Sequence, residues 1–175
     1  VVPGQDYSVT IEADENLMPY INLDKDGDKL KVKIREGINI RSKAGIKVRV
    51  SMPKVEAIAF AGSGKLKVEG TIKDVDQFEL SVAGSGDIHA DIDCPRVVAE
   101  IAGSGTITAS GKTRDVKVDI AGSGDYKGAD LMSEMAKVSI AGSGSAWLNP
   151  SLKLDISIAG AGDIYYKGNP EIKQS

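Results

Sequence analysis

The stretch VKVDIAGSGDYKG, residues 116–128, decides the fold of this 175-residue chain. Val116, Val118 and Ile120 alternate with polar residues, which is the pattern of a β-strand with one buried face. The tetrapeptide AGSG follows at residues 121–124, and the alternation resumes beyond it with Tyr126 directed inward. The stretch therefore predicts a strand, a sharp corner and a second strand.

The same arrangement recurs along most of the chain. Six such tetrapeptides (AGSG, and AGAG in the last) begin 18–22 residues apart and contain 12 of the 20 glycines. These predicted corner glycines are Gly62 and Gly64, Gly84 and Gly86, Gly103 and Gly105, Gly122 and Gly124, Gly142 and Gly144, and Gly160 and Gly162. A period near 20 residues indicates a solenoid, because a propeller blade needs about 40 residues. Helical repeats need long amphipathic helices, whereas only residues 130–137 are expected to form even a short one.

The columns formed by aligning the repeats predict which solenoid this is. The positions two and four residues before the first glycine of each pair are mostly Ile, Val or Leu. The position between these two is mostly polar. Stacked coils would place like residues on like residues, so we expect an all-β, right-handed parallel β-helix of about six coils. The glycines supply backbone angles that side chains forbid at each corner, and the serines between them predict a ladder of stacked hydroxyls.

Composition limits the classes of function. With 22 Lys and Arg against 25 Asp and Glu, the net charge of −3 gives no electrostatic case for nucleic acid or an anionic membrane. A single cysteine and a single histidine exclude an intrachain disulfide and a Cys/His zinc cluster. No apolar run is long enough for a membrane-spanning helix, and the first residues, VVPGQDYSV, do not show a signal-peptide pattern. No cofactor is expected.

The first 50 residues lack the tetrapeptide, and we expect them to form an N-terminal β cap, with irregular first coils, for the helix of residues 51–175. Strands are predicted at 7–12, 20–23, 29–34 and 46–51. Asp14 is expected to cap one helical turn that ends at Pro19. Residues 24–28, DKDGD, predict a hairpin turn, since an EF-hand loop would need its glycine at the sixth position and a glutamate at the twelfth.

A further set of motifs resembles a known family. YSVTIEADENL at residues 7–17, Gly37-Ile38-Asn39, Met52-Pro53 and the recurring AGSG together are similar to the auto-transporter adhesin, head GIN domain family of Bacteroidetes and related bacteria. The resemblance covers essentially the whole chain. It implies a right-handed parallel β-helix that is exported and lies in the periplasm, on an outer-membrane anchor or at the cell surface. It implies no catalytic residues.

Aromatic residues near the C-terminus form one candidate binding site. The column that points outward beyond the glycine corners contains Lys67, His89, Thr108, Lys127, Trp147 and Tyr165. Trp147 and Tyr165 should therefore lie about 5 Å apart on adjacent coils, with Tyr166 beside them. They predict a flat platform for a sugar ring or a partner subunit, or else a surface that another part of the chain covers.

Acidic residues form a second candidate site. Asp87, Asp125 and Asp163 directly follow the glycine pairs of alternate coils, which places them about 9.6 Å apart. Inverting glycosidases hold their two carboxylates about 6.5–9.5 Å apart, so catalysis is an alternative to a solvated ladder. Calcium is disfavoured because three of the six coils lack the aspartate, and no metal site is assigned.

His89 and Cys94 are expected to be a surface histidine and an incidental thiol rather than a catalytic pair. The leading hypothesis is a non-enzymatic structural or adhesive module that presents a rigid repetitive face to a glycan or a surface protein. The alternatives are a polysaccharide-cleaving β-helix enzyme that uses the aspartate column, and a module that assembles into homo-oligomers.

Overall fold

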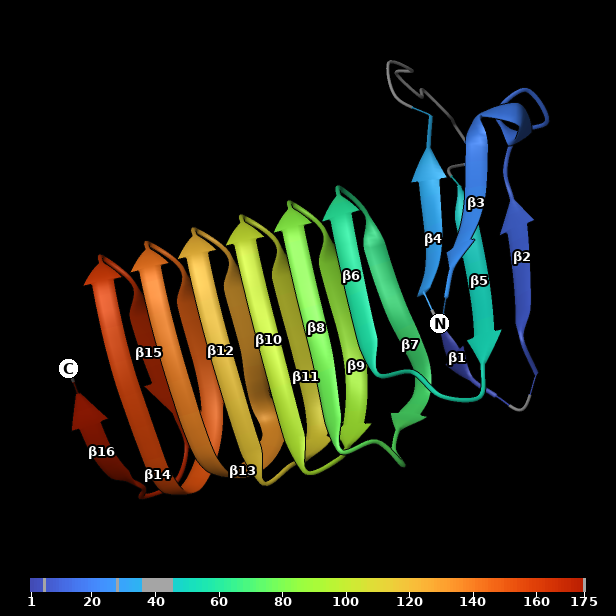
Figure 1. Cartoon of the computed structure of the whole chain (residues 1–175). Helices are drawn as coiled ribbons and strands as arrows, with labels where there is room; N and C mark the ends of the chain where they lie inside the picture. Colours follow the sequence, from blue (N-terminus) through green and yellow to red (C-terminus); the bar gives the residue numbers. More distant parts are fainter. Residues whose placement is uncertain (5, 28, 36–45, 175) are drawn as a thin grey trace. The chain divides into compact units, whose positions relative to one another are not determined.

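A computed structural model describes residues 1–4, 6–27, 29–35 and 46–174 (Figure 1). The chain divides into two compact units. Unit 1 comprises Val1–Asp6 and Ser51–Ser175, and unit 2 comprises Tyr7–Val50. Each unit is described by itself.

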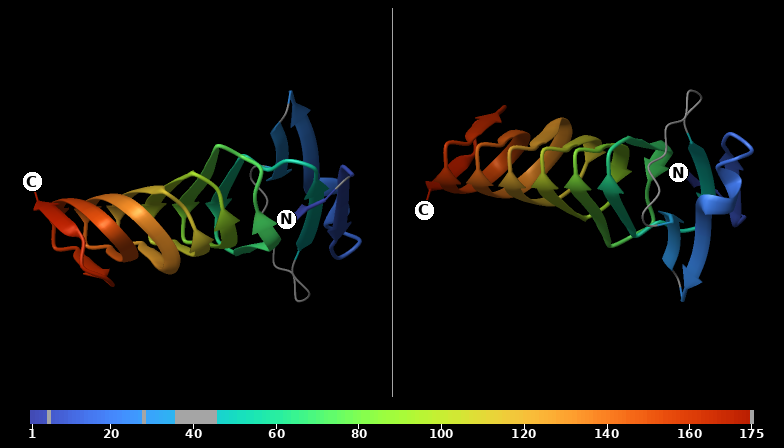
Figure 2. Two further views of the ribbon diagram at one scale, coloured as in Figure 1. Left: turned by 90° about the horizontal axis from the view of Figure 1, so that it is seen from below. Right: turned by 90° about the horizontal axis from the view of Figure 1, so that it is seen from above.

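Unit 1 is the parallel β-helix that the repeats predict. Each coil has a strand on a front face and a strand on a back face, as Figures 1 and 2 show. The front face contains β6 (Ala57–Gly62), β8 (Gln77–Gly84), β10 (Arg96–Gly103), β12 (Asp115–Gly122), the second halves of β13 (Asp125–Gly142) and β14 (Ser145–Gly160), and β16 (Glu171–Gln174). The back face contains β7 (Lys65–Ile72), β9 (Asp87–Asp93), β11 (Thr106–Lys112), the first halves of β13 and β14, and β15 (Asp163–Tyr166). The chain rises along each front strand and returns along the back strand as it advances, so the coil is right-handed (Figure 1).

Numbered by their front strands β6, β8, β10, β12, β13 and β14, the coils are coils 1 to 6. Neighbouring coils pair in register, so that Ala102 lies beside Ala121 and Gly103 beside Gly122. The predicted glycine columns are therefore confirmed. The predicted helix at residues 130–137 is wrong, because β13 continues through this segment as one strand. Leu131 and Ser133 alternate into the interior there, and the pairing with neighbouring coils outweighs local helix propensity.

The two glycines of each corner are required for different reasons. The first has positive φ in all six coils, between 110° and 138°. In coils 2 to 6 it also lies against the preceding coil, because a Cβ on Gly103, for example, would approach the carbonyl oxygen of Gly84 to 2.5 Å. A Cβ on the second glycine, Gly105, would lie 2.5 Å from both Gly86 O and Val82 Cγ1. In coils 2 to 6, a side chain at either position would therefore have to displace the coil before it.

Backbone groups build the ladder at this corner. The Ser104 amide donates to Gly84 O at 2.9 Å, and the Thr106 amide donates to Gly86 O at 3.0 Å. Each following coil repeats both bonds, through Ala161 and Asp163 in coil 6. The serine side chains at these corners are exposed, and the hydrogen bonds between successive corners are made by backbone amides and carbonyls.

The interior is filled by the inward columns. Phe78, Leu80, Val82, Ile101 and their counterparts as far as coil 5 are 0–4% exposed. The one unusual member is Tyr126, which is completely buried and whose hydroxyl has no hydrogen-bond partner among the described residues. Its ring has room because Ala146 occupies the same column in the next coil and because Gly128 has no side chain.

Residues 1–4 belong to unit 1. β1 (Val2–Pro3) pairs with Ser51 and Met52, and the Gly4 amide donates to Met52 O at 2.9 Å. Glu69 of coil 1 donates its amide to Val1 O at 2.7 Å, so this short segment adds backbone bonds to the first coil. The role of residues 1–50 as a cap stays a prediction.

Unit 2 is small and contains a hairpin. β3 (Ile21–Asp26) and β4 (Lys29–Ile34) are antiparallel, which confirms the predicted turn between them, with Gly27 at φ 60°. β2 (Ser8–Glu12) lies next to β5 (Lys47–Met52). The predicted helical turn that Pro19 ends is wrong: a hydrogen-bonded turn from Asp14 to Leu17 leads into a 3₁₀ helix, η1 (Met18–Tyr20), that contains this proline. Proline is tolerated in a first helical turn. Gly37-Ile38-Asn39 lies outside the described residues.

Candidate functional site

The back face carries the side chains that the sequence singles out. Two outward columns run along it, beside the glycine corners. The first contains Lys65, Asp87, Thr106, Asp125, Ser145 and Asp163, and the second contains Lys67, His89, Thr108, Lys127, Trp147 and Tyr165. Every neighbouring pair in both columns is in register, so each column is a continuous ladder across six coils.

Trp147 and Tyr165 stack on each other. Their ring centroids are 5.1 Å apart, and their planes differ by 12°. The rings therefore lie face to face along the helix axis, instead of side by side in a platform parallel to the sheet. Tyr165 remains 50% exposed, while Lys127 precedes Trp147 in the same column. The stack presents ring edges and the outer face of Tyr165 to solvent.

Tyr166 lies apart from this stack. It is in register with Leu148, which is 1% exposed, so it alternates to the opposite side of the strand from Tyr165. Tyr166 is nevertheless 45% exposed, because it belongs to the last back-face strand described. The structure thus brings together two of the three predicted aromatic residues.

The aspartate column has the predicted arrangement. Thr106 separates Asp87 from Asp125, and Ser145 separates Asp125 from Asp163. The carboxylates lie two coils apart, about 9.6 Å, at the upper end of the separation that inverting hydrolysis uses. In the described part of the chain, no group of three or more His, Cys, Asp or Glu residues is placed to hold a metal ion.

His89 and Cys94 are separated by the wall of the helix. His89 points outward from β9, whereas Cys94 is 5% exposed in the core and its thiol donates to Arg96 O at 3.2 Å. Burial raises the pKa of Cys94, which disfavours the nucleophilic thiolate. The pair is therefore not assembled for nucleophilic catalysis.

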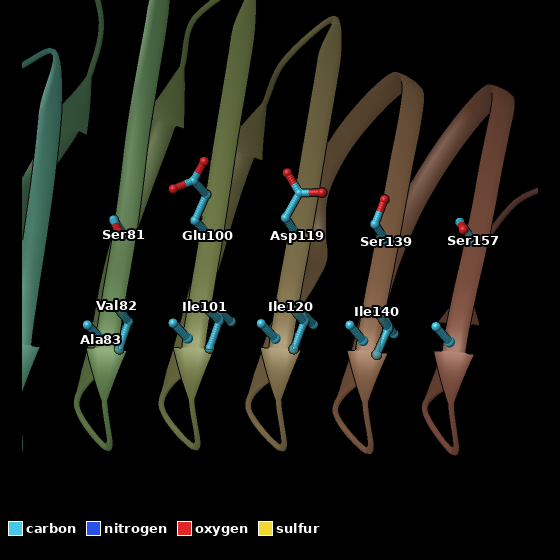
Figure 3. A pocket seen from close by; sticks show the side chains of 14 residues that line it. Ser81, Val82, Ala83, Glu100, Ile101, Asp119, Ile120, Ser139, Ile140 and Ser157 are labelled. Atoms are coloured by element: carbon cyan, nitrogen blue, oxygen red, sulfur yellow. The ribbon is translucent and has the colours of Figure 1, made fainter.

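The front face has a groove beside the glycine corners, of about 460 Å³ (Figure 3). Its floor is the alanine column, which includes Ala83 and Ala121, and its wall carries Glu100 and Asp119 between serines. Lys117 donates to Asp119 at 2.6 Å, and this hydrogen bond is the main cause that raises the pKa of Lys117. The recurring alanine before each glycine pair was the only signal of this groove in the sequence.

A second front-face groove, of about 350 Å³, lies further from the glycine corners. It combines charged with apolar side chains, and its members belong to columns that vary from coil to coil. No residue of this groove is among the site residues that the sequence predicts.

No helix in the described residues is long and apolar enough to cross a membrane. None of the curated proteins compared with the chain matches it significantly.

Several solved structures share the fold. A putative adhesin from Bacteroides fragilis is 21% identical, with a TM-score of 0.85, over 97% of this chain and 78% of that one. A protein described as a putative lipid binding protein from Parabacteroides distasonis is 25% identical, with a TM-score of 0.77, over 99% of this chain and 82% of that one. A putative adhesin from Parabacteroides merdae is 21% identical, with a TM-score of 0.70, over 95% of this chain and 78% of that one.

A family model also matches nearly the whole sequence, over residues 1–170. This match agrees with the glycine corners, the parallel coils and the similar solved structures. The chain therefore belongs to the family described as "Putative auto-transporter adhesin, head GIN domain".

Proposed function

We propose that the protein is a non-enzymatic adhesive module of an exported protein, at the cell surface or in the periplasm, and that its back face binds a glycan. The observation that carries the proposal is the stack of the half-buried Trp147 on the exposed Tyr165. Aromatic rings offer apolar surface to the C–H groups of a sugar, and the tyrosine hydroxyl and indole N–H add polar contacts.

Polar groups surround this stack as a sugar requires. Ser145 and Asp163 lie two residues before the stacked rings on the same strands, and Lys127 lies beside Trp147 in the preceding coil. Sugar hydroxyls can donate to the carboxylate and accept from the lysine. Because the backbone ladders hold the strands that carry these side chains in place before binding, no backbone ordering is needed when the ligand arrives.

A glycan array is the first test. Trp147→Ala and Tyr165→Ala should each abolish or strongly weaken the signal for the glycan that the wild type binds. Tyr166→Ala is the matched control, since it removes a similarly exposed ring on the other side of the strand. A wild type that binds no glycan, or three variants that lose binding equally, would refute the proposal.

The same preparations test the competing functions. Reducing ends released from polysaccharides by the wild type, and lost in Asp125→Asn, would establish the enzyme. A mass in light scattering that falls to the monomer value in Trp147→Ala would establish self-association through the stack. Binding to phosphatidylcholine vesicles would support a lipid ligand, although the inward columns of the middle coils are already filled by buried side chains.

A further inference from the structure

We infer that the second front-face groove is a distinct binding site for a carboxylate-bearing polysaccharide. Two outward columns line it. One includes Arg96, Asp115, Met135 and Lys153, and the other includes Val98, Lys117, Lys137 and Asp155. The groove spans several coils, so an extended polymer lying along the helix axis fits it better than a compact ligand.

The charges of the groove favour an anion. Each of its two carboxylates already has a cation: Arg114 pairs with Asp115 at 2.9 Å, and Lys153 pairs with Asp155 at 3.0 Å. Lys117 is paired outside the groove with Asp119. Across the described ranges, no ion pair is made by Arg96 or Lys137, and both are exposed.

Arg96 and Lys137 are placed to read two charges of a repeating chain. They belong to coils 3 and 5, so they lie about 9.6 Å apart along the axis. The guanidinium of Arg96 suits a planar carboxylate, which it can bind through two parallel hydrogen bonds. On the same two coils, the half-buried Val98 and the 42% exposed Met135 offer apolar surface to the faces of sugar rings.

One feature favours a sugar acid over a phosphate polymer. Glu79 continues the column of Val98, and Glu100 and Asp119 lie in the next column, so a densely charged anion would be repelled.

The test is titration calorimetry with polygalacturonate oligomers at low and at raised sodium chloride. The double variant Arg96→Gln/Lys137→Gln should bind about tenfold more weakly than the wild type, and the affinity of the wild type should fall as salt screens the contacts. Lys65→Gln/Lys67→Gln makes the same change of net charge on the back face and should bind normally. Trp147→Ala should also bind normally, which separates this site from the glycan site proposed above.

Three results would overturn the inference. The first is absence of polygalacturonate binding by the wild type at low salt. The second is equal weakening in the front-face and back-face double variants, which would mean attraction to net charge alone. The third is equally tight binding of a neutral galactan. The substituted Lys and Arg side chains are exposed and Trp147 is half-buried, so denaturation curves that match the wild type are the control that the variants fold.

Discussion

Gly122 stacks directly against the carbonyl group of Gly103 in the preceding coil, at a φ of 122°. A methyl group there would meet this oxygen and would also require a strained backbone. We expect Gly122→Ala to lower the free energy of unfolding by about 3 kcal/mol, as measured by urea denaturation.

Gly62 provides the matched control for this prediction. Its φ is similar, at 114°, but nothing lies within 4 Å of a Cβ placed on it. Gly62→Ala should therefore cost only the backbone strain, about 1 kcal/mol. Equal losses in the two variants would mean that contact between successive corners contributes nothing measurable.

The buried hydroxyl of Tyr126 predicts a stabilising substitution. This group lacks a hydrogen-bond partner in the described structure, and burial without a partner costs free energy. Tyr126→Phe keeps the ring and should raise the free energy of unfolding by about 1 kcal/mol in the same denaturation experiment. A loss of stability would show instead that a bound water or another group satisfies the hydroxyl.

Tyr126 also predicts that the folded protein loses stability at alkaline pH. Burial raises the pKa of its phenol above the ordinary value of 10.0, so the folded state holds this proton more tightly than the unfolded state. The free energy of unfolding therefore keeps its full value while the pH is below the pKa that Tyr126 has in the unfolded chain. It falls as the pH rises above that pKa. Stability measured between pH 9 and pH 11.5 should fall more steeply for the wild type than for Tyr126→Phe. Parallel curves would contradict this assignment.

Cys94 should be unreactive in the folded protein. Its side chain is buried, and burial also raises its pKa, so both access and thiolate formation are disfavoured. A thiol reagent such as Ellman's reagent should label it at pH 8 only after denaturant is added. Rapid labelling of the native protein would show that the turn between β9 and β10, which contains Cys94, opens readily.

Trp147 is the only tryptophan in the chain and reports on the aromatic stack. Tyr165→Ala removes the ring that covers one of its faces, so its emission should shift to longer wavelength and acrylamide should quench it more strongly. Tyr166→Ala should leave both properties unchanged. A similar response in the two variants would mean that the stack does not persist in solution.

The parallel coils, the glycine corners and the outward ladders were predictable because each position recurs in six repeats. In such an arrangement one sequence column becomes one structural column, so the register of Trp147 on Tyr165 follows from counting residues. The orientation of the rings does not follow from counting. It depends on rotamers, and the stacked geometry replaced the expected platform.

Predictions were weaker wherever the repeat was interrupted. Residues 130–137 have helix-forming composition, and only pairing with the neighbouring coils makes them a strand. Tyr166 looked like a neighbour of Tyr165, whereas strand alternation directs it the other way. The second groove was not predictable from the sequence, because its charge depends on which basic side chains form ion pairs with carboxylates. Those pairings depend on side-chain geometry.

The corner ladder joins each coil only to the coils before and after it, with the same two backbone bonds at nearly every step. Loss of residues 103–121 would bring Gly122 onto Gly84 with the contacts that Gly103 now makes. A duplication of the same segment would be accommodated equally well. Whole coils can therefore be gained or lost in evolution, and the span of the molecule can be adjusted in increments of about 4.8 Å.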